Sequence, residues 1–186
     1  MTASSPLHAR PDRSAPILGF AAWSGTGKTT LLKSLIPELR RRGIRVGLMK
    51  HAHHGFEIDH PGKDSYELRH AGASPVLVTS SRRRALVTER PEPRDPVLEE
   101  ELAHFDSRGV DLILVEGFRD AAIPKIVLYR RGHAEGRPSL HDEDVNVVAV
   151  ATDDPAAAEG GVPVLDINDP AAVAEFIVRD FLGKAA

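Results

Sequence analysis

Apolar residues along this chain gather in short runs, with amphipathic stretches between them. The runs predict strands at 17–21, 44–50, 75–80, 85–89, 110–116, 125–129, 145–151 and 162–166. Apolar positions that recur every three to four residues predict helices at 28–42, 64–71, 97–108 and 170–182. Because strands alternate with helices, we expect an α/β fold whose largely parallel sheet carries helices on both faces.

Two of these strands are expected outside the parallel sheet. Only Ser81–Arg84 separates the segments 75–80 and 85–89, so the pattern predicts a β-hairpin extension. The tip of this hairpin carries Arg82, Arg83 and Arg84. Such a run is either a solvated surface or a contact for an anionic ligand or an acidic partner. The residues alone leave both interpretations open.

Composition narrows the class of protein. The length of 186 residues suits one domain, expected at 16–186, and the Ser-, Pro- and Arg-rich segment 1–15 predicts a disordered tail. The net charge of −3 provides no general basic field for nucleic acid. The absence of cysteine fits a reducing, cytoplasmic compartment. No apolar run approaches the length of a membrane span. From the net charge we expect no nucleic acid as partner, and from the apolar runs no membrane.

The segment 22–30, AWSGTGKTT, lies between the first predicted strand and the first predicted helix. Its glycines let successive N–H groups point at phosphate oxygens, and the helix adds the positive end of its dipole. In such a loop Lys28 reaches the β- and γ-phosphates and the Thr29 hydroxyl binds Mg²⁺. Ala22 replaces the usual first glycine and is small enough for the loop to survive. We therefore expect a P-loop NTPase fold in which Gly25, Thr26, Gly27, Lys28, Thr29 and Thr30 bind phosphate.

Acidic residues are sorted by the end of the strand at which they lie, because ligands of parallel sheets bind beyond the carboxyl ends. Asp111 precedes its apolar run and lies at the wrong end, whereas Glu116 ends the run at the ligand side. Glu116 is therefore our candidate for holding Mg²⁺ or its waters, against the alternative of a solvated acid that opens a turn. Asp153 and Asp154 also follow a strand. Each either starts a turn before Pro155 or selects guanine by accepting its N1–H and N2–H.

The loop after the second strand is dense in histidine and aspartate. Three interpretations stay open: a transition-metal site, a mobile polar loop, or a switch-like segment over a γ-phosphate. In the third, Asp59 or Asp64 lies near the Mg²⁺. The residues concerned are His51, His53, His54, Asp59, His60 and Asp64.

Four motifs follow one another along the chain: AAWSGTGKTT at 21–30, MKHAHH at 49–54, DHPGKDSY at 59–66 and VEGF at 115–118. Together they closely resemble the molybdopterin-guanine dinucleotide biosynthesis protein B family, MobB, over residues 16–155. The resemblance implies a GTP-binding, homodimeric adapter whose partner is the MobA nucleotidyltransferase, which attaches GMP to molybdopterin. It implies that Gly25, Gly27, Lys28 and Thr29 hold phosphate and Mg²⁺, that Asp59 and Glu116 belong to the metal and γ-phosphate region, and that Asp153 selects the base. Trp23 stands where many members of the wider P-loop group carry an extra lysine.

The first expectation is a weakly hydrolysing GTP-binding accessory protein of molybdenum cofactor maturation, with Lys28, Glu116 and Asp59 as its catalytic residues. The first alternative is a small-molecule kinase with Arg130, Arg131 and Arg137 as a phosphate-clamping lid. The second is a non-catalytic carrier of molybdopterin. The sequence leaves open whether molybdopterin binds this chain directly.

Overall fold

The computed structural model describes residues 15–52, 55–133, 144–157 and 161–184. The chain divides into two compact units, one formed by residues 1–51 with 102–186 and the other by residues 52–101. The first unit contains a parallel sheet and the second a β-hairpin. The tail 1–14 and residues His53, His54 and Arg137 lie outside the described residues. The expected single domain at 16–186 stays a prediction.

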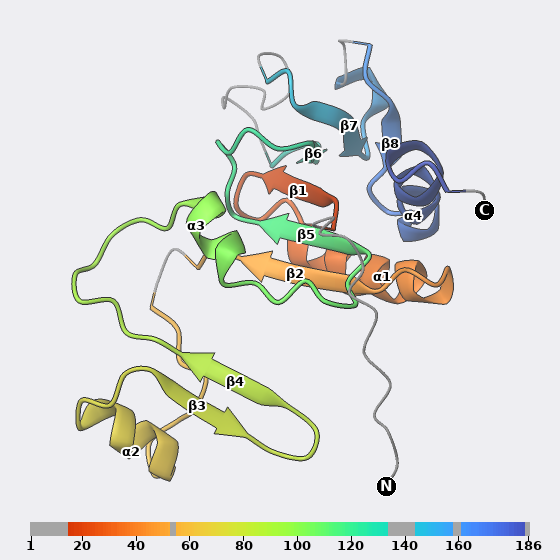
Figure 1. The fold of residues 1–186 in the computed structure, drawn as a ribbon. Helices are drawn as coiled ribbons and strands as arrows, with labels where there is room; N and C mark the ends of the chain where they lie inside the picture. The colour runs from red at the N-terminus through yellow and green to blue at the C-terminus, as the bar shows by residue number, and fades with distance from the viewer. Residues whose placement is uncertain (1–14, 53–54, 134–143, 158–160, 185–186) are drawn as a thin grey trace, which may run out of the picture. The chain divides into compact units, whose positions relative to one another are not determined.

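Six strands form the sheet of the first unit, in the order β2-β5-β1-β6-β7-β8, and every neighbouring pair is parallel (Figure 1). The largely parallel α/β fold expected from the sequence is thereby confirmed. All five neighbouring pairs align their carboxyl ends, so the loops after β1, β2, β5, β6 and β7 meet at one edge. The strands are β1 (Ile17–Ala22), β2 (Val46–Lys50), β5 (Leu112–Glu116), β6 (Lys125–Tyr129), β7 (Val147–Thr152) and β8 (Val164–Asp166).

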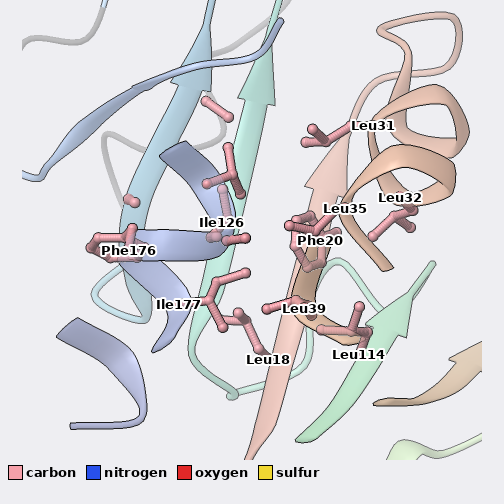
Figure 2. Close-up of a cluster of buried hydrophobic side chains, with 14 of the residues drawn as sticks. Leu18, Phe20, Leu31, Leu32, Leu35, Leu39, Leu114, Ile126, Phe176 and Ile177 are labelled. Atoms are coloured by element: carbon pink, nitrogen blue, oxygen red, sulfur yellow. The ribbon is translucent and has the colours of Figure 1, made fainter. Parts of the chain in front are cut away.

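Two helices pack against each other on one face of this sheet: α1 (Lys28–Arg41) and α4 (Pro170–Phe176), which continues as the π-helical turn η2 (Ile177–Phe181). The alternate residues Leu18 and Phe20 of β1 point into this layer, as do Leu35 and Leu39 of α1 (Figure 2). The last two lie four residues apart and therefore share one side of the helix. Each fully buried leucine contributes about 1.5–3 kcal/mol by leaving water.

The opposite face of the sheet near β2 is covered by chain rather than by a long helix. An added Cβ on Gly47 would lie 2.6 Å from the Phe105 ring and 3.2 Å from the Val110 side chain. At the amino end of β5, Asp111 accepts hydrogen bonds from the Arg45 backbone N–H and guanidinium, which holds the pKa of Asp111 far below its usual value. Asp111 is therefore a structural residue at the far end from the ligand edge, as expected.

The second unit contains α2 (Asp64–His70), the antiparallel pair β3 (Val76–Thr79) and β4 (Arg84–Val87), and most of α3 (Leu98–Ala103). Leu77 and Leu86 face each other in register, and both are well exposed at 60% and 64%. The guanidinium of Arg69 pairs with Glu57, Asp59 and Glu89 and ties the segment before α2 to the hairpin.

All eight predicted strands are present, but one helix is shorter than expected. The segment 97–108 is helical only over α3, because the Asp106 carboxylate accepts hydrogen bonds from the Arg108 backbone N–H and guanidinium and forms a turn instead. A short 3₁₀ turn, η1 (Pro155–Ala157), follows β7. Across the described ranges, no helix combines the length and apolar character that a bilayer crossing requires.

Candidate functional site

Two glycines shape the backbone of the loop between β1 and α1. Gly25 and Gly27 adopt φ values of +86° and +99°, where a side chain would be strained. Ala22 ends β1 as an ordinary strand residue, so the replaced glycine costs nothing in conformation. Thr26 is buried, and its hydroxyl donates to the Trp23 carbonyl at 2.8 Å. The Thr26 side chain therefore braces the loop from inside.

The amino end of α1 opens directly onto this loop. Gly27 is the residue before the helix, and because it is a glycine it offers no side-chain cap to the N–H groups of the first turn. Those donors and the helix dipole favour an anion at this position. Lys28 is half-buried beside them, and Thr29 and Thr30 are exposed. These residues are thus accessible to a ligand, although their assignment to phosphate stays a prediction.

Strand register brings the charged side chains of Glu116 and Lys50 together at this edge of the sheet. Glu116 pairs in register with Lys50 of β2 on one side and with Phe20 of β1, three residues before the loop, on the other. The Lys50 Nζ lies 3.0 Å from a carboxylate oxygen of Glu116, which is itself buried.

The charges of Glu116 and Lys50 both affect the pKa of Lys28. Burial lowers the pKa of Lys28, the carboxylate of Glu116 opposes that shift, and the nearby ammonium of Lys50 adds to it. Lys50 is a site residue that the sequence analysis missed, because its place beside Glu116 depends on β5 inserting between β1 and β2.

A tight turn fixes the direction of Glu116. Gly117 has φ +96°, and an added Cβ there would lie only 2.8 Å from the His51 carbonyl oxygen. The His51 N–H donates to the Glu116 carbonyl at 2.8 Å, and its ring lies 5.2 Å from that of Phe118. His51 is therefore part of the packing around the turn after β5.

A buried lysine holds the loop that follows this turn. The Lys125 ammonium donates to the carbonyls of Arg119 and Ala121 at 2.7 and 2.9 Å and pairs with Asp144 at 2.5 Å. The Arg119 guanidinium lies over the ring of Trp23, 5.0 Å from its centroid. Lys125 was not singled out from the sequence, although a lysine at the start of an otherwise apolar strand is a usable signal.

The two aspartates after β7 are engaged by arginines. Asp153 accepts from the Arg131 backbone N–H at 2.9 Å and from the Arg130 guanidinium at 3.2 Å. The first of these bonds is the largest cause that lowers the pKa of Asp153. Asp154 pairs with the Arg131 side chain at 3.1 Å. Both acids lie at the ligand edge as expected, and their part in base selection stays a prediction.

Asp59 belongs to the second unit, where its Oδ1 lies 3.7 Å from the Arg69 guanidinium. That oxygen is buried, and no described residue forms a hydrogen bond with it. Asp64 is the first residue of α2, and His60 is exposed. Within the described ranges, no three histidine or acidic side chains are grouped to hold a metal ion. The described residues of the histidine-rich loop thus give no support to a transition-metal site.

The donor chemistry in the first unit fits Mg²⁺. This ion prefers oxygen ligands, binds through one or two protein groups together with phosphate, and keeps several waters. The Thr29 hydroxyl at the start of α1 and the Glu116 carboxylate at the end of β5 supply such oxygens at the same edge of the sheet.

Residues 17–153 match the sequence model of a family described as molybdopterin guanine dinucleotide synthesis protein B, MobB. The chain belongs to the MobB family. A molybdopterin-guanine dinucleotide biosynthesis adapter protein of Escherichia coli (strain K12) is 53% identical over 164 residues, which are 88% of this chain and 92% of that protein. The counterpart from Haemophilus influenzae is 43% identical over 87% of both chains. The resemblance found in the sequence is thus confirmed.

Solved structures of MobB proteins share the fold. A MobB homologue from Bacillus stearothermophilus matches with a TM-score of 0.67 at 26% identity, over 90% of this chain and 99% of that one. A crystal structure of Bacillus subtilis MobB matches with a TM-score of 0.65 at 25% identity, over 87% and 95% of the two chains. The P-loop NTPase-like α/β fold is therefore common to this chain and its family.

Proposed function

We propose that this chain is a GTP-binding adapter of molybdopterin-guanine dinucleotide biosynthesis that hydrolyses GTP slowly and acts with a MobA-type nucleotidyltransferase. Two relatives are named as adapter proteins of this biosynthesis. The proposal that the chain binds a nucleotide rests on the glycine-containing loop that precedes the amino end of α1. The charged residues Lys28, Lys50 and Glu116 lie beside this loop.

In this proposal the free N–H groups of α1 and the Lys28 ammonium bind the β- and γ-phosphates. The Thr29 hydroxyl and the Glu116 carboxylate hold Mg²⁺ and its waters. Bound there, Mg²⁺ neutralises charge on the phosphates. Glu116 is already paired with Lys50 and is a poor general base, so hydrolysis is slow unless a partner adds a group.

Nucleotide preference tests this proposal. Trp23 is the single tryptophan of the chain and lies in the loop, so its fluorescence is a direct reporter of binding. GTP with Mg²⁺ should change the emission at lower concentration than ATP with Mg²⁺. Lys28→Ala should abolish the response, whereas Lys33→Ala, exposed on the same helix, should leave it intact.

Other outcomes point to the alternatives. A preference for ATP, with turnover that rises when an acceptor is added, would favour a kinase over the adapter. Molybdopterin binding with no response to GTP would favour a carrier. A normal thermal melt of Lys28→Ala with unchanged GTP affinity would contradict the phosphate-binding role of the loop.

We further propose a homodimer built partly through the hairpin of β3 and β4. Its support is the exposed cross-strand pair Leu77 and Leu86, since exposed apolar pairs on a two-stranded sheet favour association. Sedimentation should give twice the chain mass of 20.2 kDa, and Leu86→Asp should shift it toward the single chain. A single-chain mass for the parent, with or without GTP, would contradict the dimer.

A further inference from the structure

Arg130 lies beside the phosphate loop although it is distant from that loop in sequence. It follows β6 directly, and β6 pairs with β1 up to the register of Leu128 with Ala22. Its guanidinium Nε lies 3.3 Å from the Thr26 carbonyl oxygen. The position is thus set by the sheet, which brings the ends of β6 and β1 together.

The guanidinium lies close to the place where the anion is expected. A Cβ added to Gly27, the residue before α1, would meet the Arg130 Nη2 at 3.9 Å and Nε at 4.0 Å. Among the described residues other than the chain neighbours of Gly27, these are the nearest atoms to that position, so Arg130 flanks the amino end of α1. A guanidinium presents a planar fork of N–H donors that matches phosphate oxygens.

Two other segments hold the guanidinium. Asp153, after β7, accepts from its Nη1 at 3.2 Å, and Asn168, after β8, accepts from its Nη2 at 3.1 Å. The Asn168 backbone N–H in turn donates to the Asp166 carboxylate at 2.8 Å. In the described part of the chain these contacts use three of the five N–H donors of Arg130, and two remain for a ligand.

We propose that Arg130 is a phosphate-contacting residue of the GTP site, and that Asp153 and Asn168 are positioning residues that hold its guanidinium there. This inference rests on the proposed function. It gives Asp153 a role other than base selection, since each of its carboxylate oxygens accepts a hydrogen bond from an arginine, Arg130 or Arg131.

Calorimetric titration with GTP, and competition of GTP by tripolyphosphate, test the assignment. Tripolyphosphate carries the anion without the base. Arg130→Ala should weaken both ligands by the same factor, about tenfold to a hundredfold for the loss of charged hydrogen bonds. Arg130→Lys should recover part of the loss, because it keeps the charge without the fork. Arg179→Ala, which removes an exposed arginine of η2 that pairs with Asp180, is the control and should stay close to the parent.

The positioning residues are tested by a double-mutant cycle. Asp153→Asn and Asn168→Ala should each weaken GTP and tripolyphosphate in a background with Arg130 and have little effect in the Arg130→Ala background. Asp153→Asn should also leave the order of GTP, ATP and xanthosine triphosphate unchanged. A gain of xanthosine triphosphate over GTP would instead assign Asp153 to the base and overturn its positioning role.

Thermal melts of all variants separate loss of binding from loss of fold. Unchanged GTP affinity in a folded Arg130→Ala protein would overturn the Arg130 assignment and leave the proposed function standing. Weakening of GTP without weakening of tripolyphosphate would overturn it as well. Absence of GTP binding by the parent would overturn the proposed function and this inference together.

Discussion

At the scale of single residues, the candidate site is governed by the charges of Glu116, Lys50 and Lys28. Glu116 is buried, and its carboxylate lies 3.0 Å from the Lys50 ammonium. The same carboxylate acts against the lowering of the pKa of Lys28 by burial. A buried carboxylate is tolerated only when it is paired, so Lys50 stabilises Glu116.

We expect Glu116→Gln to reduce GTP hydrolysis much more than GTP binding. The amide keeps the shape but loses the charge that, in the proposed function, orients metal-bound water. Single-turnover hydrolysis should therefore fall by about tenfold or more while affinity changes little. Quench measurements on pre-bound GTP check this. If Glu116→Gln hydrolyses like the parent and Asp59→Asn is inactive, the metal role belongs to Asp59.

The lowered pKa of Lys28 predicts a pH dependence of phosphate binding. The anion binds the protonated amine, so affinity should fall as pH rises through the pKa of Lys28. This fall should come below the usual lysine value of about 10.4. Lys28→Arg should hold its affinity over the same range, because a guanidinium stays protonated. Titrations of the parent and of Lys28→Arg with tripolyphosphate from pH 7 to 10 compare the two affinities. A parallel fall of affinity in both proteins would exclude Lys28 as the cause.

The sequence located the loop and the strand-end acids because these are local patterns. Gly25, Lys28 and Glu116 each follow from a motif or from one strand and its end. Lys50 was not assigned to the phosphate site, and Arg130 was considered only as part of a phosphate-clamping lid in the kinase alternative. The contacts of both residues depend on which strands are neighbours. The arginine partners of Asp153 also depend on tertiary contacts, and they change the interpretation of that residue.

At the scale of elements, β6 supports the site through its first residue. Lys125 is a buried cation at a strand position where an apolar residue is usual. Its ammonium joins the start of β6 to the loop at Arg119 and to Asp144. Partial burial acts against ionisation of Asp144, but hydrogen bonds from Lys125 and Asn146 hold its pKa below the usual value. The pair therefore contributes stability above about pH 4, which is lost as pH falls through the pKa of Asp144.

We expect Lys125→Met to destabilise the protein by about 1.5–3 kcal/mol at neutral pH, because two carbonyls and a carboxylate lose a charged donor. Urea unfolding measures this cost. The same variant should alter Trp23 fluorescence, since the loop carries Arg119 over that ring. Stability equal to the parent would mean that the replacement packs as well as the ion pair.

The start of α4 gives an element-scale prediction. Asp169 accepts from the backbone N–H groups of Ala171 and Ala172 at 3.0 Å each, and Pro170 follows it as the first helical residue. Asp169→Ala should therefore cost about 0.5–2 kcal/mol, the usual value of a lost cap. Asp180→Ala, a change of the same charge outside the cap, is the control. Equal unfolding midpoints for the two variants would contradict the cap.

Strands were predicted better than helix ends in this chain. Runs such as Leu112–Glu116 are bounded by glycine and charge, which mark their limits in the sequence. The end of α3 at Ala103 depends instead on a turn stabilised by Asp106 and Arg108, and the π-helical end of α4 depends on burial of Ile177 and Val178. Such contacts have no periodic signature.

At the scale of the whole molecule, strands that are consecutive in the sequence are not always neighbours in the sheet. β1 and β2 are consecutive in the chain, but β5 lies between them and β6 lies on the other side of β1. We expect a chain ending at residue 111 to carry the complete glycine-rich motif and yet bind no GTP, with the full chain as control. Trp23 fluorescence in both proteins checks this, and a GTP response from the shortened chain would contradict it.

This order has a consequence for biosynthesis on the ribosome. The strand that leads into the phosphate loop is the first to be made, and both of its neighbours begin only at Leu112 or later. At ordinary translation rates the interval is on the order of ten seconds. Throughout it, the nascent chain carries the motif without the sheet that shapes it. If the proposed GTP site is the one described above, GTP cannot guide the early steps of folding, because the site forms only when the second half of the chain arrives.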